Sequence, residues 1–203
     1  MKYINILNTL EGWCSEEKAT KLYTLITWTR PQKVVEIGVF GGKSLIAQAF
    51  ALKDNGGGKI IGIDSWSKED CLEAMVDAAA IDWWSKLDYD YIYNGCVNAI
   101  SVNELNDYVE LIKKKSADCV DLVGNDIDIL HIDGNHEELS SCRDVKLYLP
   151  KLKVGGFLWF DDAGWKQTQK AIKLIEEEFK LVLVDKAQSL DVDNYCGLYK
   201  KME

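Results

Sequence analysis

Short apolar runs recur along the chain, separated by glycine turns and by segments with apolar residues at helical spacing. The apolar runs span residues 34–37, 59–64, 109–112, 127–132, 153–160, 181–184 and 195–199. Runs of this length that alternate with helical segments predict the β-strands of an α/β domain. We therefore expect a doubly wound, mostly parallel seven-stranded sheet with helices on both faces. The last two runs predict an antiparallel pair with a hairpin through residues 185–194.

An amphipathic helix is predicted over about residues 15–30. Ser15 suits its N-cap, and Leu22, Leu25 and Ile26 form an apolar stripe at helical spacing. Such a stripe favours a helix that covers one side of the sheet over one that contacts a substrate.

A glycine-rich turn follows the first apolar run and is the stretch around which the chain is organised. Residues 34–44 pass through Gly38, Gly41 and Gly42 and lead directly into the almost wholly apolar segment 45–52. The pattern predicts a strand, a tight turn and a buried helix. Such a turn places backbone N–H groups and the positive end of a helix at the carboxyl edge of the sheet. We therefore expect a cofactor site here.

The glycine spacing narrows the class of cofactor. Gly38, Gly41 and Gly42 lack the second glycine of a dinucleotide fingerprint, and only three residues separate Gly38 from Gly42, where a phosphate-binding P-loop needs four. Glu36, two residues before the turn, would repel a phosphate and attract an ammonium or sulfonium group. The turn thus favours a cationic ligand.

An acid in the expected place for a ribose contact ends the second apolar run. Asp64 lies 22 residues after Gly42, and ribose-binding acids lie about 20 residues beyond the glycine turn. Trp66, two residues further on, is placed for its ring to lie against an adenine. Together these positions predict a nucleoside-containing cofactor.

The motif formed by Glu36, Gly38 and Gly42, followed by Asp64, resembles the first two motifs of the class I S-adenosylmethionine-dependent methyltransferases. The resemblance covers most of the chain and implies a Rossmann-like fold and S-adenosylmethionine as cofactor. In that family the segment after the third strand contacts the adenine, which implies a role for Ser116. The residues expected to bind the cofactor are Glu36, Gly38, Phe40, Gly41, Ser44, Asp64, Ser65, Trp66, Ser116 and Asp133.

Residues 65–108 form an aromatic-rich insertion, longer than a connection between a strand and the next element requires. Its large aromatic residues include Trp66, Trp83, Trp84, Tyr89, Tyr91 and Tyr93. Apolar residues over 71–79 predict a helix. We expect the insertion to serve as a mobile lid or as a dimer interface.

Two stretches end in acids at the carboxyl edge of the sheet. Asp133 follows the fourth apolar run, and Asp161 and Asp162 follow the fifth. In the strand order that the resemblance implies, these strand ends are neighbours about 4.8 Å apart, so the carboxylates converge. A hard divalent cation would relieve their repulsion. Because no cysteine joins the cluster, magnesium, manganese or calcium is favoured over structural zinc.

The same stretches resemble the metal-dependent small-molecule O-methyltransferases, especially those that modify macrolide sugars. That resemblance implies that Asp133, Asp161 and Asp162 hold magnesium and that His136 is the general base beside Asp133. Asp161 stands where the group commonly has glutamate, so it is expected to be the weaker ligand. The metal would lower the pKa of a sugar or catechol-like hydroxyl, and His136 would remove its proton before attack on the sulfonium methyl. His131, within the strand, is expected to be a partly buried, hydrogen-bonded core residue and not a catalyst.

The amino-acid composition limits which binding partners and which cell compartment fit the chain. The 203 residues suit one domain (1–203), and the net charge of −9 argues against a nucleic-acid partner. Six cysteines without a C-x-x-C pair, and no signal segment, predict reduced thiols and a cytoplasmic location. The apolar runs are too short to span a bilayer. We expect a small-molecule or glycan acceptor, and a homo-oligomer would be consistent with the aromatic insertion.

Two other functions fit the sequence. A protein or N-methyltransferase would share the cofactor motifs without needing a metal. A non-catalytic module that binds an adenosyl ligand would use the aromatic insertion as an interface. Turnover of the cofactor with sugars and catechols distinguishes catalysis from binding alone.

Overall fold

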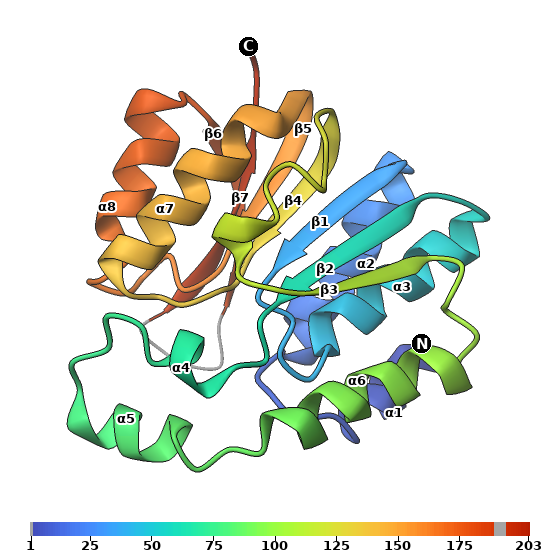
Figure 1. Ribbon diagram of the computed structural model, residues 1–203. Coiled ribbons are helices and arrows are strands. Elements are labelled where there is room, and N and C mark those ends of the chain that lie inside the picture. Colours follow the sequence, from blue (N-terminus) through green and yellow to red (C-terminus); the bar gives the residue numbers. More distant parts are fainter. Residues whose placement is uncertain (1, 189–193) are drawn as a thin grey trace.

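Seven strands form one sheet in the computed structural model, which describes residues 2–188 and 194–203 (Figure 1). The strands are β1 (Lys33–Ile37), β2 (Lys59–Asp64), β3 (Val109–Lys113), β4 (Ile127–Ile132), β5 (Leu152–Phe160), β6 (Val182–Gln188) and β7 (Tyr195–Lys200). Their order is β3-β2-β1-β4-β5-β7-β6, in which β1 to β5 run parallel and β7 runs antiparallel to both neighbours. The predicted Rossmann-like fold is confirmed. Of the predicted final hairpin, residues 189–193 lie outside the described residues.

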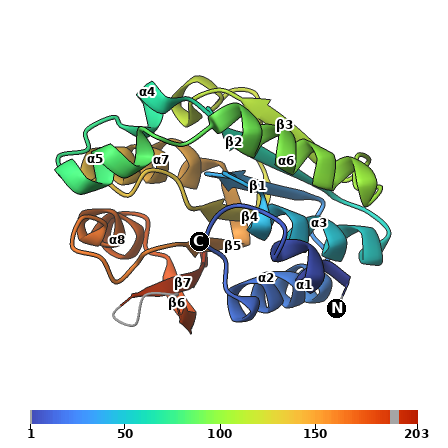
Figure 2. The same cartoon turned by 90° about the horizontal axis from the view of Figure 1, so that it is seen from below.

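Helices cover both faces of the sheet, with α2, α3 and α6 on one side and α7 and α8 on the other (Figures 1 and 2). The helices are α1 (Lys2–Leu7), α2 (Glu16–Thr29), α3 (Lys43–Asn55), α4 (Lys68–Cys71), α5 (Ala78–Trp84), α6 (Tyr89–Val102), α7 (Glu138–Tyr148) and α8 (Gln169–Lys173). Short 3₁₀ turns are η1 (Ser116–Asp118) and η2 (Leu149–Lys151), and a π-helical turn, η3 (Leu174–Glu178), extends α8. None of the helices within the described residues is long and apolar enough to cross a membrane.

Alternation along each strand builds two cores, because successive side chains point to opposite faces. Val34 and Ile60 pack with α2 and α3 on one face, and Val35 packs with α7 on the other. α3 is buried from Ser44 to Leu52 because it packs against both α2 and β2. This explains why its sequence is apolar on almost every side. α2 begins as predicted, with the Ser15 hydroxyl accepting the Lys18 amide proton at 3.0 Å.

The insertion lies beyond the carboxyl ends of the strands, where Figure 1 shows α4 and α5 below the arrowheads. The prediction of one helix over residues 71–79 is wrong. α4 ends at Cys71, Ala74 adopts a left-handed backbone, and the Asp77 side chain caps a new helix by accepting the Ala80 amide proton at 2.7 Å. An N-capping aspartate at this place starts α5 and interrupts the apolar stripe.

Gly38 sets the distance between the glycine turn and the end of β4. Its φ is +85°, and a β-carbon there would lie 2.0 Å from the carbonyl oxygen of Asp133. The Gly38 amide donates to Ile63 at 2.9 Å, and the Asp133 amide donates to Ile37 at 2.8 Å. Only glycine permits both the left-handed backbone and this close approach.

We predict that Gly38→Ala lowers the free energy of unfolding by more than about 2 kcal/mol, because it adds left-handed strain to a backbone overlap. Urea unfolding measures the change. Gly57→Ala is the matched control, since nothing lies within 4 Å of a β-carbon there and its φ is not positive. Equal losses in the two variants would show that the Gly38 contact does not constrain the turn.

Candidate active site

A cavity of about 600 Å³ lies at the carboxyl edge of the sheet. The glycine turn, the insertion, and the ends of β4 and β5 form its walls. Of the residues predicted to bind the cofactor, those that line the cavity are Gly38, Phe40, Gly41, Ser44, Asp64, Ser65, Ser116 and Asp133. The two that do not are Glu36 and Trp66. The structure therefore gathers most of the predicted site around one space.

Asp64 holds the glycine turn in place. Its Oδ2 accepts the amide protons of Val39 at 3.0 Å and Phe40 at 2.9 Å, and its Oδ1 accepts that of Trp66 at 2.8 Å. Burial raises the pKa of Asp64, and the three backbone donors oppose that rise. Each carboxylate oxygen can accept more than one hydrogen bond, so Asp64 can also bind a ligand in the cavity that it lines.

Glu36 does not face the cavity, which corrects its predicted contact with a cationic ligand. It is fully buried and accepts hydrogen bonds from the Ser44 hydroxyl at 2.6 Å and from the Gln48 amide at 2.5 Å. Its Oε2 also lies 3.4 Å from Nδ1 of His131. Because Glu36 points from the middle of β1 into the protein, its charge acts on buried neighbours.

Trp66 is also placed differently from the prediction. Its backbone is left-handed, its side chain is 4% exposed, and its indole Nε1 donates to the Phe40 carbonyl at 2.8 Å. The ring packs against Tyr93 of α6, with 4.8 Å between centroids. The indole therefore supports the glycine turn from the core and does not line the cavity.

Aromatic residues from two distant segments meet at the rim of the cavity. Trp13 stacks on Phe40 with 5.6 Å between centroids, and Trp84 of α5 meets Phe40 edge to face at 5.7 Å. Trp83 packs against both tryptophans. All four line the cavity, although Trp13 and Trp83 stay about half exposed. The insertion thus contributes a wall of the site, while its use as a mobile lid or an interface stays a prediction.

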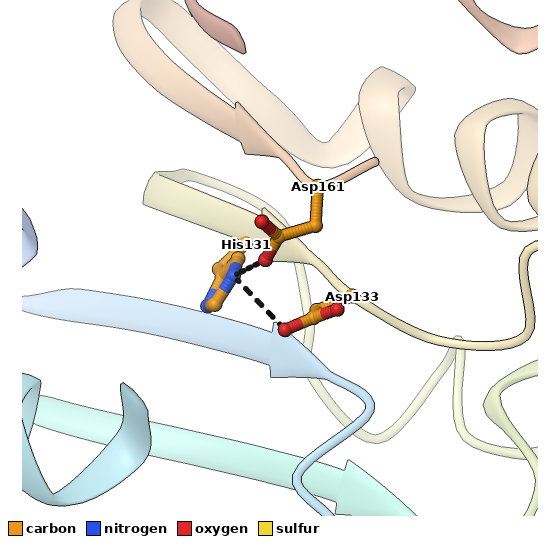
Figure 3. A group of neighbouring side chains, drawn as sticks. All are labelled: His131, Asp133 and Asp161. Atoms are coloured by element: carbon orange, nitrogen blue, oxygen red, sulfur yellow. Dashed lines mark hydrogen bonds and ion pairs between the residues drawn. The ribbon is translucent and has the colours of Figure 1, made fainter. Parts of the chain in front are cut away.

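Two acids, of which Asp161 is buried and Asp133 is partly exposed, converge on His131 at the ends of β4 and β5. Figure 3 shows His131, Asp133 and Asp161 pointing toward one another, with His131 Nε2 at 2.9 Å from Asp161 Oδ2 and 3.9 Å from Asp133 Oδ2. Asp161 also accepts a hydrogen bond from the Cys196 thiol. The predicted buried, hydrogen-bonded His131 is found in the structure, and its partners are charged.

Lys18 lies in the site although its sequence position did not predict it. Its ammonium donates to Asp133 Oδ2 at 2.7 Å and to Asp161 Oδ2, and its side chain is 6% exposed. Burial alone would lower the pKa of Lys18, but the charges of Asp133 and Asp161 raise it well above its usual value. The sequence contains one indication that Lys18 is buried. It lies four residues before Leu22 and therefore on the apolar stripe of α2.

Lys18 and His131 also determine the charge of Asp161. Burial would raise the pKa of this carboxyl, and the two neighbouring cations hold it well below its usual range. Burial likewise opposes protonation of His131, but Glu36 and Asp161 raise its pKa to about 9. The cluster therefore contains carboxylates that are paired with cations of the protein itself.

The three acids predicted as metal ligands do not form one ligand set. Asp161 points to Lys18 and His131, whereas Asp162 has a left-handed backbone and pairs with His136 Nε2 at 2.9 Å and with the Asn194 amide. The two acids follow the last residue of β5, Phe160, and their side chains have different partners. A different group of residues, Asp133, His136 and Asp162, places three possible metal-ligand atoms within 4.8 Å of one another.

His136 lies at the cavity wall beside Asp162. Its ring meets Trp165 edge to face at 5.0 Å, and both residues line the cavity. Burial alone would lower the pKa of His136, but the hydrogen bond to Asp162 and its charge raise it. An imidazole oriented by a carboxylate is a common general base.

A family described as a methyltransferase domain matches residues 35–163, more than half of the chain. The chain belongs to this methyltransferase family. The match covers most of β1, the glycine turn, β4 and the acids after β5, whereas Trp13, Lys18 and Trp165 of the cavity wall lie outside it. The resemblance to the class I S-adenosylmethionine-dependent methyltransferases is confirmed. No curated protein sequence is significantly similar to this chain.

Solved structures share its fold at low sequence identity. An O-methyltransferase from Bacillus cereus in complex with SAH is 16% identical, with a TM-score of 0.70 over 98% of this chain and 89% of that one. The O-methyltransferase TomG from Streptomyces achromogenes, involved in tomaymycin synthesis and solved with SAM, is 16% identical, with a TM-score of 0.67 over 94% and 82%. The O-methyltransferase NovP is 14% identical, with a TM-score of 0.70 over 92% and 80%.

We predict that His131→Gln removes a pH-dependent part of the stability. Because the pKa of His131 is raised from 6.5 to about 9, its charge stabilises the fold fully below about pH 6.5, and this contribution is lost as the pH rises through about 9. The difference in unfolding free energy between wild type and variant should shrink by on the order of 3 kcal/mol over that window. Urea unfolding across the window measures it, and a constant difference would contradict the ion pairing.

Proposed function

We propose that this methyltransferase transfers the methyl group of S-adenosylmethionine to a hydroxyl oxygen of a small molecule, such as a sugar or a catechol-like ring. The observation that carries the proposal is the His136–Asp162 pair at the wall of the cavity that the glycine turn also lines. A base is what a hydroxyl nucleophile requires, because the oxygen attacks poorly while it holds its proton. The three similar structures reported above are named as O-methyltransferases.

The cofactor would occupy the part of the cavity next to the glycine turn. Asp64 would accept hydrogen bonds from the ribose hydroxyls, and the backbone of Gly38 and Phe40 would lie beside the methionine moiety. Ser116 and Asp144 also line the cavity, and the Ser116 hydroxyl donates to Asp144 at 2.5 Å. Burial raises the pKa of Asp144 to about 6. This polar pair suits the amino group of an adenine.

His136 would act as the base through Nδ1. The hydrogen bond from Nε2–H to Asp162 assigns the proton to Nε2 and leaves the Nδ1 lone pair free. The O–H bond of the acceptor breaks as Nδ1 takes the proton, and the oxygen bonds to the methyl carbon. The C–S bond breaks with its electron pair passing to sulfur, which becomes a neutral thioether. Holding both reactants in one cavity would supply much of the rate.

The aromatic rim of Trp13, Phe40, Trp83 and Trp84 supports a small planar or sugar-like acceptor. Tryptophan rings offer apolar faces on which either kind of ring can stack. A cavity of about 600 Å³ falls within the size range of small-molecule sites. The net charge of −9 offers no basic surface for a nucleic-acid acceptor. A cytoplasmic location and a homo-oligomer stay predictions.

Divalent metal assistance also stays a prediction. A divalent cation held there would lower the pKa of a hydroxyl bound to it. Asp133 and Asp162 are the acids that could hold one, because Asp161 is paired with Lys18 and His131. If His136 became the third ligand, its interaction with Asp162 would be lost and so would the base. The ammonium of Lys18 is a cation that the protein itself supplies at this edge of the sheet.

The test is transfer of a labelled methyl group from S-adenosylmethionine to a panel of sugars and catechols. Methylated product identified by mass spectrometry would support the proposal. Methylation of amines or of protein alone would favour the N- or protein methyltransferase, and cofactor binding without turnover on any acceptor would favour a binding module.

We predict that His136→Ala lowers kcat by about 10²–10⁴ while cofactor affinity stays unchanged. In the wild type, kcat should rise with pH through an apparent pKa above 6.5, because the raised pKa of His136 keeps it protonated at lower pH. Rate measurements from about pH 6 to 9 test this. A variant with the wild-type rate would remove His136 from the mechanism.

We predict that Asp64→Ala weakens S-adenosylmethionine binding by about 1.5–3 kcal/mol for each charged hydrogen bond lost. Part of the loss comes from the turn, because Asp64 also holds the Val39 and Phe40 amides. Isothermal titration calorimetry gives the affinity, and circular dichroism checks the fold. Asp185→Ala, at an exposed carboxylate far along the chain, is the control. Unchanged affinity would take Asp64 out of the cofactor site.

A further inference from the structure

Lys18 reaches the catalytic edge of the sheet from a helix on one of its faces. It lies in the first turn of α2, yet its ammonium ends between carboxylates at the ends of β4 and β5. Lysine side chains are rarely buried unless they are paired. The position of Lys18 therefore requires an explanation beyond covering the sheet.

The ammonium takes the place in which a cation would bind both acids. Lys18 donates to Oδ2 of Asp133 and to Oδ2 of Asp161, and Nε2 of His131 lies 2.9 Å from the same oxygen of Asp161. A divalent ion on these oxygens would have to displace the ammonium or lie against a like charge. The position between Asp133 and Asp161 thus already holds a cation.

The charges around Lys18 also argue against a divalent ion at these acids. The carboxyl groups of Glu36, Asp133 and Asp161 lie beside two basic groups, Lys18 and His131, and those of Glu36 and Asp161 are buried. Because cations of the protein itself already pair with these acids, a divalent ion is not needed to hold them together. Lys18 also lines the cavity, and its two contacts with acids of the described residues leave one of its three N–H donors.

We infer that Lys18 replaces a divalent metal in this enzyme, so that its ammonium stabilises the acceptor oxygen while methyl transfer proceeds without a metal. The inference rests on the proposed O-methylation. As His136 takes the hydroxyl proton, negative charge develops on the acceptor oxygen, and the remaining N–H of Lys18 donates to it. A fixed cation at a developing alkoxide stabilises the transition state more than the ground state.

Direct metal binding tests the inference without any turnover. Titration of the wild-type protein with MnCl₂, followed by electron paramagnetic resonance, should show no Mn²⁺ bound at the acid cluster. Lys18→Met removes the ammonium and should allow Mn²⁺ to bind, and Lys18→Met combined with Asp133→Asn should abolish that binding. Mn²⁺ bound by the wild type and lost in Asp133→Asn would overturn the inference.

Activity gives a second readout. Wild-type transfer should be unchanged by excess EDTA and by added Mg²⁺, whereas Lys18→Met should lose about 10²–10³ in kcat with cofactor affinity retained. Lys21→Met is the matched control, because Lys21 lies on the same helix and pairs with the exposed Asp185 at 3.0 Å. It should keep the wild-type rate. Loss of wild-type activity with EDTA, or a full rate in Lys18→Met, would overturn the inference.

The experiments distinguish failure of the proposed O-methylation from failure of the proposed role of Lys18. If no hydroxylated acceptor is methylated, the proposed function is wrong, and the Mn²⁺ titration of the wild type still decides whether Lys18 excludes a metal. If Lys18→Met does not fold, the EDTA and Mn²⁺ experiments on the wild type decide the question alone.

Discussion

The ion pairs between Lys18 and the acids at the ends of β4 and β5 are the interaction on which the rest of the site depends. Removing carboxylates from water is costly, and a buried acid remains charged only beside a cation or several hydrogen-bond donors. Lys18 contacts both Asp133 and Asp161, and with His131 it holds the pKa of Asp161 well below its usual range. It also connects α2 to the catalytic edge, so a helix that covers the sheet takes part in the site.

From this pairing a buried polar network runs back to the cofactor turn. Asp161 contacts His131, His131 faces Glu36, and Glu36 accepts hydrogen bonds from Ser44 at the start of α3. The glycine turn and the catalytic edge are therefore held by one continuous set of contacts. Because each buried member depends on its neighbour for compensation, removal of one member leaves a charge or a donor unpaired. Such a network fixes the glycine turn relative to the ends of β4 and β5.

The aromatic rim of the cavity is built from a different kind of contact. Its rim comes from Trp13 before α2 and from Trp83 and Trp84 in the insertion, which meet over Phe40. These contacts are aromatic and partly exposed, in contrast to the buried charges at the sheet edge. The rim can thus change with the insertion while the glycine turn and the acids at the sheet edge stay the same.

The strands, the glycine turn and the positions of Asp64 and His136 at strand ends could be predicted from residue order, because each follows from local patterns: strand period, turn chemistry and position at a strand end. The directions of buried side chains could not. Glu36 and Trp66 lie beside the predicted site but face the core, because their partners come from other segments of the folded chain. Lys18 and Asp133 are 115 residues apart. Their contact depends on how α2 packs against the sheet, so a lysine that replaces an expected metal became visible only in the folded chain.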